Sequence, residues 1–215
     1  METKKNLISS KEIVFLYIIF IVGILGHLLP QIKDYMIALT PITLLITGTV
    51  VLFYSYKTSN GKFLIWTILT YIITFALEVI GVKSGLVFGE YSYGSSLGFK
   101  VFEVPLIIGF NWVFVILGSI SISLIITDKK VLIVLLSALI SLIFDFVLEP
   151  VAIKLNYWQW NEGVIPIQNF VAWFVIAFLA ASIFMTMQIN VKSKASIHYL
   201  LIQYVFFLIL LFFYR

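Results

Sequence analysis

The sequence contains no cysteine and only two histidines among its 215 residues. The absence of cysteine excludes disulfide bonds, thiol catalysis, iron–sulfur clusters and cysteine-ligated zinc. Two histidines, His27 and His198, are too few for the histidine clusters of membrane di-iron hydroxylases and desaturases. Glycine-rich dinucleotide and P-loop fingerprints are also missing. The remaining chemistry must come from carboxylates, amides and aromatic side chains, so neither a cofactor nor a metal is expected.

Charged residues are scarce as well. They make up 11% of the chain, against about 25% in an average soluble domain, whereas 62% of the residues are hydrophobic. This scarcity, together with repeated apolar runs of roughly twenty residues, predicts an integral membrane protein. The first run is long for a signal peptide and no small-residue cleavage site follows it, so we expect no cleaved leader. The net charge of +4 is modest and indicates no nucleic-acid partner.

The pattern predicts an all-α polytopic membrane bundle that forms one domain over residues 1–215. We expect seven transmembrane spans, at about 12–29, 35–56, 62–80, 104–126, 131–149, 165–188 and 197–214. Nine of the 14 Lys and Arg residues fall in the N-terminal tail and in the loops on its side of the membrane, and five fall on the other side. The positive-inside rule then predicts a cell-membrane protein with a cytoplasmic N-terminus and an external C-terminus.

Two carboxylates close the fifth span, in the stretch FDFVLEP at 144–150. Asp145 and Glu149 are four residues apart, so on a helix their Cβ atoms would lie about 5–6 Å from each other. An ionisable residue within a span costs about 2.5–3.5 kcal/mol on insertion scales and usually faces a cavity or a partner. Since neighbouring anions repel, one carboxyl is expected to keep its proton as an acid while the other serves as a base. Pro150 is expected to end the helix and to free backbone carbonyls beside the pair.

Two stretches of the chain resemble each other. In both copies a Leu-Glu ends a span, an aromatic-x-aromatic element follows in the loop, and a proline opens the next span. A tryptophan follows each proline at the same spacing, from Pro105 to Trp112 and from Pro166 to Trp173. The alternative is coincidence, because prolines favour helix starts and tryptophans favour interfaces. A true repeat would relate spans 3–4 to spans 5–6 by an axis along the membrane normal, with the two glutamates facing a shared cavity.

These patterns select the candidate site residues. The candidate catalytic residues are acidic: Glu78, Glu90, Asp145 and Glu149. The candidate substrate-binding residues are aromatic or carry an amide: Tyr91, Tyr93, Asn111, Trp112, Trp158, Trp160, Gln168, Asn169 and Trp173. Aromatic rings can line a pocket for a long apolar ligand, and buried amides can orient a water or a carboxylate. The alternatives are solvated carboxylates at the headgroup boundary, interfacial aromatic anchors and ordinary interhelical hydrogen bonds.

Four ordered motifs together resemble the integral-membrane carotenoid hydratase family: LEVIGVKSGLVFGEYSY, VPLIIGFNW, FDFVLEPVAIKLNYWQW and IPIQNFVAWF. The resemblance covers about residues 70–175. It implies addition of water across the terminal carbon–carbon double bond of an acyclic ψ end group, which gives a tertiary alcohol. It also implies substrates such as lycopene, γ-carotene or a bacterioruberin precursor, and a distant relationship to membrane lycopene cyclases.

The resulting hypothesis is a carotenoid 1,2-hydratase that works by carboxylate acid–base catalysis. A related lycopene cyclase would use the same protonation but lose a proton instead of adding water. A non-catalytic carotenoid-binding or transport protein would instead place the carboxylates along a permeation path. The expected partners are a lipid-soluble carotenoid and membrane lipid. The sequence leaves open whether the chain forms a homo-oligomer or associates with other enzymes of the carotenoid pathway.

Overall fold

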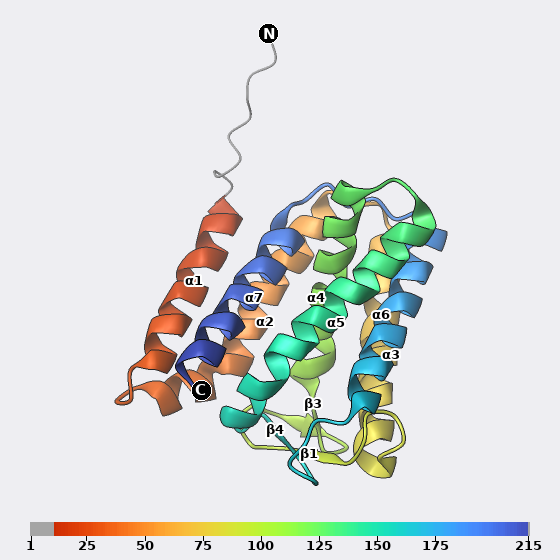
Figure 1. Ribbon diagram of the computed structural model, residues 1–215. Coiled ribbons are helices and arrows are strands. Elements are labelled where there is room, and N and C mark those ends of the chain that lie inside the picture. Colours follow the sequence, from red (N-terminus) through yellow and green to blue (C-terminus); the bar gives the residue numbers. More distant parts are fainter. Residues whose placement is uncertain (1–10, 215) are drawn as a thin grey trace.

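The computed structural model describes residues 11–214, which fold into a bundle of seven helices (Figure 1). Each of these helices is long and apolar enough to cross a membrane. They are α1 (Lys11–Leu28), α2 (Lys33–Lys57), α3 (Lys62–Ser84), α4 (Leu106–Ile126), α5 (Lys130–Lys154), α6 (Ile167–Thr186) and α7 (Ala195–Phe213). A helix satisfies its backbone hydrogen bonds internally, as hydrocarbon requires. The predicted polytopic helical bundle is confirmed.

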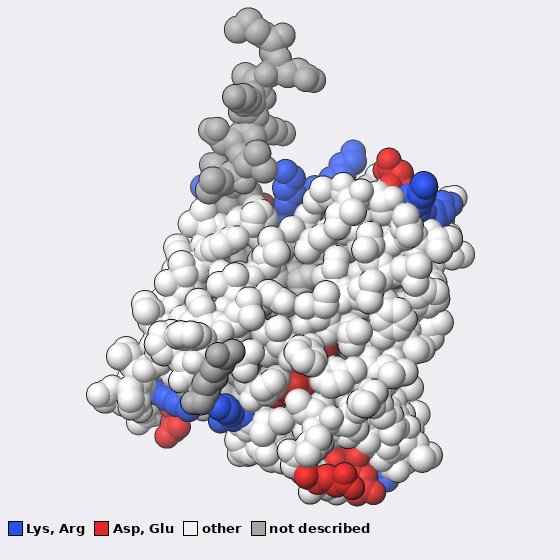
Figure 2. Space-filling view, in the orientation of Figure 1, with Lys and Arg blue, Asp and Glu red and all other residues white. Residues whose placement is uncertain are grey.

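Charged side chains gather at the two ends of the bundle and leave a largely uncharged band between them (Figure 2). This distribution fits a multi-pass membrane protein. One end carries four short strands, β1 (Tyr91–Tyr93), β2 (Lys100–Val101), β3 (Val104–Pro105) and β4 (Trp158–Trp160), and we call it the strand end. α1 begins at the opposite end, the far end, and α7 runs toward the strand end (Figure 1). That the strand end faces the cell exterior remains a prediction.

The two aromatic-x-aromatic elements of the sequence repeat pair with each other. β1 follows α3, β4 follows α5, and the two strands are antiparallel. Tyr91 lies opposite Trp160, and Tyr93 lies opposite Trp158. β2 and β3 form a separate small hairpin that leads into α4. The loop of one copy therefore pairs with the loop of the other, an arrangement that is compatible with an axis along the bundle.

The repeated proline and tryptophan also occupy matching places. Pro105 and Pro166 are the N-caps of α4 and α6, so each proline opens a helix as predicted. Trp112 and Trp173 then stack face to face, with ring centroids 3.6 Å apart and planes inclined by 12°. Equivalent residues of the two copies thus meet inside the bundle as well as in its loops.

The prediction that Pro150 ends the fifth span is wrong. α5 continues to Lys154 with Pro150 in its interior. Proline has no N–H and leaves the carbonyl four residues earlier without its helical donor. Membrane helices tolerate this because neighbouring groups and local adjustments satisfy the freed carbonyl. α3 likewise passes its expected end at 80 and stops at Ser84, where Gly85 adopts a left-handed φ of +67°.

Small side chains let α4 pack closely at the centre of the bundle, where it contacts α2, α3, α5, α6 and α7. Two serine pairs link it to α5. Ser137 Oγ lies 3.2 Å from Ser123 Oγ, and Ser141 Oγ lies 2.9 Å from Ser119 Oγ. Such small-residue contacts and interhelical hydrogen bonds are how helices associate in lipid, where burial of apolar surface gives no driving force.

Gly118 permits the close approach of α4 to α7. A Cβ added there would lie 2.7 Å from the backbone oxygen of Ser196 and 2.7 Å from Leu200 Cβ. We therefore expect Gly118→Ala to destabilise the protein by about 1–3 kcal/mol through overpacking. Thermal unfolding in detergent micelles measures the effect. Gly61→Ala is the matched control, because nothing lies within 4 Å of its added Cβ. Equal unfolding midpoints for the two variants would contradict this account of the packing.

Candidate active site

A cavity of about 210 Å³ lies inside the bundle, next to the paired strands. Three acidic side chains line it, Glu78 from α3 and Asp145 and Glu149 from α5. Only 1–3% of each of these side chains is exposed. Most of the remaining wall is apolar and aromatic. The acids therefore face a confined, water-poor space and not the headgroup boundary.

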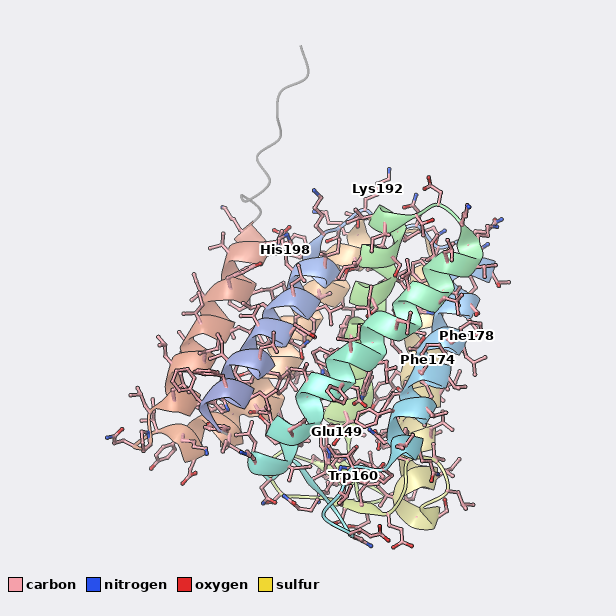
Figure 3. All side chains as sticks on the ribbon, in the orientation of Figure 1. Glu149, Trp160, Phe174, Phe178, Lys192 and His198 are labelled. Carbon is pink, nitrogen blue, oxygen red and sulfur yellow. The ribbon has the colours of Figure 1, made fainter. Side chains whose placement is uncertain are left out.

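Asp145 and Glu149 lie on successive turns of α5 and are bridged by one amide of α6. Asn169 Nδ2 donates to Asp145 Oδ2 and to Glu149 Oε1, at 3.0 Å in both cases. Glu149 Oε2 accepts two further hydrogen bonds, from Trp158 Nε1 at 2.9 Å and from Trp160 Nε1 at 3.0 Å. Figure 3 shows Glu149 and Trp160 side by side at the strand end. Glu149 thus accepts three N–H hydrogen bonds, and Asp145 accepts one.

Glu78 has the equivalent environment in the other copy of the repeat. The hydroxyls of Tyr91 and Tyr93 both donate to Glu78 Oε2, the second at 2.7 Å. Burial and then the nearby Glu78 carboxylate raise the pKa of Tyr91 and of Tyr93 well above the ordinary value of tyrosine. Both hydroxyls therefore keep their protons and remain donors. Each glutamate of the repeat is held by the aromatic-x-aromatic element that follows it, through phenol groups in one copy and indole groups in the other.

No permanently charged cation faces these acids among the described residues. Within residues 11–214 no Lys or Arg lines the cavity. Three buried carboxylates cannot all be ionised at low cost, because like charges repel and burial disfavours the charged form. Hydrogen-bond donors stabilise an ionised acceptor, so Glu149 is the carboxylate best suited to carry the negative charge. Asp145, with a single donor, is the one best suited to hold a proton.

Aromatic rings enclose the acids. Trp173 is stacked between Trp112, at a centroid distance of 3.6 Å, and Phe88, at 5.1 Å. The Tyr91 ring lies 5.0 Å from that of Trp160 across the paired strands. Ring faces carry partial negative charge and attract cations. The cavity can therefore protonate a bound apolar group and stabilise the positive charge that results.

The cavity reaches the side of the bundle that faces lipid. Val22 of α1 and Leu39 of α2 belong to its lining, and 55% and 44% of these side chains are exposed. Figure 2 shows acidic atoms at the bottom of a hollow within the uncharged band. A ligand dissolved in the membrane can therefore enter sideways between helices.

The structure brings most of the predicted site residues together. Eleven of them line the cavity: Glu78, Tyr91, Tyr93, Asn111, Trp112, Asp145, Glu149, Trp158, Trp160, Asn169 and Trp173. Glu90 and Gln168 lie outside it and are exposed. Glu90 accepts a hydrogen bond from Asn161 Nδ2 at 3.0 Å, and Gln168 donates to the carbonyl of Leu86. Within residues 11–214 no group of three or more His, Cys, Asp or Glu side chains is arranged to hold a metal ion.

Sequence reasoning did not select five polar residues that line the cavity: His27, Thr40, Thr43, Tyr157 and Gln203. Gln203 lies in the middle of α7 and His27 near the end of α1, and both line the cavity. A single amide inside an otherwise apolar span was the available signal for Gln203, since polar groups in spans usually face the protein interior. The only sequence signal for His27 was its position at the end of a span, where a histidine can equally well contact lipid headgroups.

Comparisons with known proteins bear on this site. Residues 39–214 match the model of a family described as "Carotenoid biosynthesis protein". One curated relative, the bisanhydrobacterioruberin hydratase of Haloarcula japonica, is 27% identical over 125 residues. The alignment covers 52% of this chain and 41% of the relative, so the chain spans less than half of the relative's length. No solved structure shows a significant match.

Proposed function

The chain belongs to the carotenoid biosynthesis protein family, and from this premise we propose that it is a carotenoid 1,2-hydratase. The observation that carries the proposal is the buried pair Asp145 and Glu149, bridged by Asn169 in a cavity open to lipid. The hydratase name of the Haloarcula relative supports the reaction type. The substrate would be an acyclic ψ end group, as in lycopene, γ-carotene or a bacterioruberin precursor, and the product a tertiary alcohol.

The reaction starts with Asp145 as the acid. Its proton passes to the terminal alkene, whose π electrons form the new C–H bond and leave a cation on the adjacent tertiary carbon. The oxygen of a water molecule then forms the C–O bond, and the Glu149 carboxylate takes the proton that this water releases. Return of that proton to Asp145 restores the site. The sum is one alkene and one water converted into one alcohol, without a cofactor.

The surroundings of the pair favour this sequence of steps. The uncovered faces of the aromatic rings that line the cavity stabilise the cation by about 0.5–2 kcal/mol per contact. The N–H donors hold Glu149 in its ionised form. Because the site excludes bulk water, solvent screens little of the attraction between this carboxylate and the cation. Glu78 holds Tyr91 and Tyr93 in place and adds a third acidic group to the cavity.

The size of the cavity supports binding of an end group and not of a whole carotenoid. Its volume of about 210 Å³ is below the roughly 300–1,000 Å³ that encloses a drug-sized ligand. The polyene would therefore leave through the opening beside Val22 and Leu39 and extend into the bilayer. Such a site needs to recognise only the end of its substrate.

Expression in a lycopene-accumulating bacterium tests the proposal. The wild-type protein is expected to yield an acyclic pigment that is heavier than its precursor by one water. Glu78→Gln, Asp145→Asn and Glu149→Gln should each reduce the yield, whereas Glu162→Gln, at an exposed position outside the cavity, should not. Unchanged pigment from well-inserted wild-type protein would remove the hydratase proposal for this substrate. A cyclised pigment of unchanged mass would favour the cyclase alternative.

A further inference from the structure

Two buried side chains in the cavity carry polar atoms that have no hydrogen-bond partner among residues 11–214. Gln203 is 1% exposed, and neither Oε1 nor Nε2 of its amide has a partner within residues 11–214. His27 is 4% exposed, and its Nε2 is unpaired within the same residues. Both side chains line the space that holds the carboxylates. Burying a polar group without a hydrogen bond is costly, so two such groups in one cavity indicate a ligand that completes their bonds.

The hydrogen bond of His27 defines what this ligand must offer. His27 Nδ1 lies 2.7 Å from the carbonyl oxygen of Gly23, which can only accept, so Nδ1 carries the hydrogen. In the neutral imidazole the other nitrogen, Nε2, then has a bare lone pair and needs a donor. The Gln203 amide offers one acceptor and two donors. A water molecule can pair with all three atoms, because it donates one hydrogen to His27 Nε2, donates the other to Gln203 Oε1 and accepts from Gln203 Nε2. An alcohol hydroxyl can still donate to Nε2 of His27 and accept from Nε2 of Gln203, whereas an anion has no hydrogen for His27.

The two side chains lie on a different wall of the cavity from the acids. His27 and Gln203 come from α1 and α7, which pack against each other, while the carboxylates come from α3 and α5. The walls are in contact close to the acid, since Phe207, one turn after Gln203, packs edge-on against Phe144 at a centroid distance of 5.9 Å. Phe144 directly precedes Asp145. A group bound between the two walls can therefore have Asp145 on one side and His27 and Gln203 on the other.

We propose that His27 and Gln203 form an oxygen subsite, which holds first the water that adds and then the tertiary hydroxyl of the product. The inference rests on the proposed hydration, and it places the second substrate of that reaction, water, beside His27 and Gln203. Asp145 supplies the proton to the alkene carbon, and the held water supplies the oxygen of the new C–O bond. The water's released proton passes to Glu149. His27 and Gln203 are positioning residues in this scheme, because neither gains nor loses a proton in the net reaction.

Loss of the subsite should change the fate of the cation. A cation without a positioned water loses a proton and returns to an alkene. In heavy water this return leaves deuterium in the recovered carotenoid, so protonation and hydration can be measured separately. We expect Gln203→Leu to lower the ratio of tertiary alcohol to deuterated alkene by about tenfold or more, since misplacing a reactant is expensive. His27→Phe should lower the same ratio, whereas Asp145→Asn should remove both products.

Two substitutions outside the cavity serve as controls. Ser55 is also buried with an unpaired oxygen within residues 11–214, but it does not line the cavity. His198 is the other histidine, and its Nδ1 pairs with the Tyr17 hydroxyl at 3.2 Å. Ser55→Ala and His198→Phe should keep the wild-type ratio. Thermal midpoints in detergent complete the comparison. Because Leu replaces an unpaired amide, Gln203→Leu should unfold no earlier than wild type.

Each outcome decides between the two proposals. If wild type forms neither alcohol nor deuterated alkene, the hydratase proposal fails and the subsite fails with it. If wild type hydrates while Gln203→Leu and His27→Phe keep its product ratio, only the oxygen subsite is wrong. The subsite is equally wrong if both products fall together, or if Gln203→Leu unfolds earlier than wild type, because the amide would then stabilise the fold and not a ligand.

Discussion

Replacing Asp145 by asparagine is expected to lower the rate of hydration by about 10²–10⁴-fold, the usual contribution of a general acid, and to leave the fold intact. Asparagine cannot supply the proton. Its amide nevertheless has the shape of a protonated carboxyl, so its oxygen can still accept the hydrogen bond from Asn169 Nδ2. The rate of tertiary-alcohol formation in isolated membranes and the thermal midpoint in detergent measure the two effects.

Asp34→Asn provides the matched control for this substitution. Asp34 is exposed in the first turn of α2 and lies outside the cavity, so the same chemical change should have no effect on the rate. A variant Asp145→Asn that retains more than about a tenth of the wild-type rate would assign the acid to another residue. Glu78 would then be the next candidate, since it is the remaining buried acid of the cavity.

Glu149→Gln is expected to lose a comparable amount of activity and also to destabilise the protein by about 1–3 kcal/mol, the cost of buried groups left unpaired. Three N–H donors converge on Glu149, from Trp158, Trp160 and Asn169. One end of the glutamine amide is an N–H₂ group. It would place a donor against the surrounding N–H groups, where the carboxylate of Glu149 places an acceptor. Thermal unfolding of purified protein checks the loss of stability.

The two variants together test which carboxylate is charged. The exposed Glu162→Gln is the matched control for the second of them. If Asp145→Asn proved unstable while Glu149→Gln unfolded like the wild type, the roles of acid and base would have to be exchanged. A loss of stability in both variants would mean that both carboxylates are ionised at rest and that neither is a ready proton donor.

The general arrangement of the site follows from the sequence because it depends on repeated spacing. The Leu-Glu ends, the aromatic-x-aromatic elements and the distance from Pro105 to Trp112 recur in the second copy, and the structure joins these equivalent features. The family resemblance, which rests on the same motifs, is confirmed. Asp145 and Glu149 were identifiable because a charge within an apolar run is expensive and needs a cavity.

Other features could not be predicted, for separate physical reasons. Pro150 breaks helices in water, but the interior of a bundle in lipid can accommodate the lost hydrogen bond, so the rule for soluble helices gave the wrong end of α5. Gln203 belongs to a span that carries no motif, and hydropathy does not tell which side of a helix faces a cavity. Glu90 sits among aromatic residues in the sequence, yet only the folded loop shows that it is exposed and lies outside the cavity.

The packing of the far end disfavours the transport alternative. Phe63, Trp66 and Phe184 are fully buried there, and Trp66 Nε1 donates to the carbonyl of Ala180 at 2.9 Å. Rings close together at that end of α3 and α6 fill the space through which a permeating molecule would have to pass. The carboxylates lie near the strand end of α3 and α5, so all three buried acids of the cavity are on one side of this barrier.

The two glutamates of the repeat differ in the chemistry of their aromatic partners, which are phenols at Glu78 and indoles at Glu149. A phenol can accept a hydrogen while it gives another, whereas an indole N–H can only donate. The hydroxyls of Tyr91 and Tyr93 can therefore give a proton to Glu78 and accept one in return, whereas the indoles of Trp158 and Trp160 can only donate to Glu149. The two equivalent glutamates of the sequence repeat are therefore held by groups with different abilities to pass a proton on.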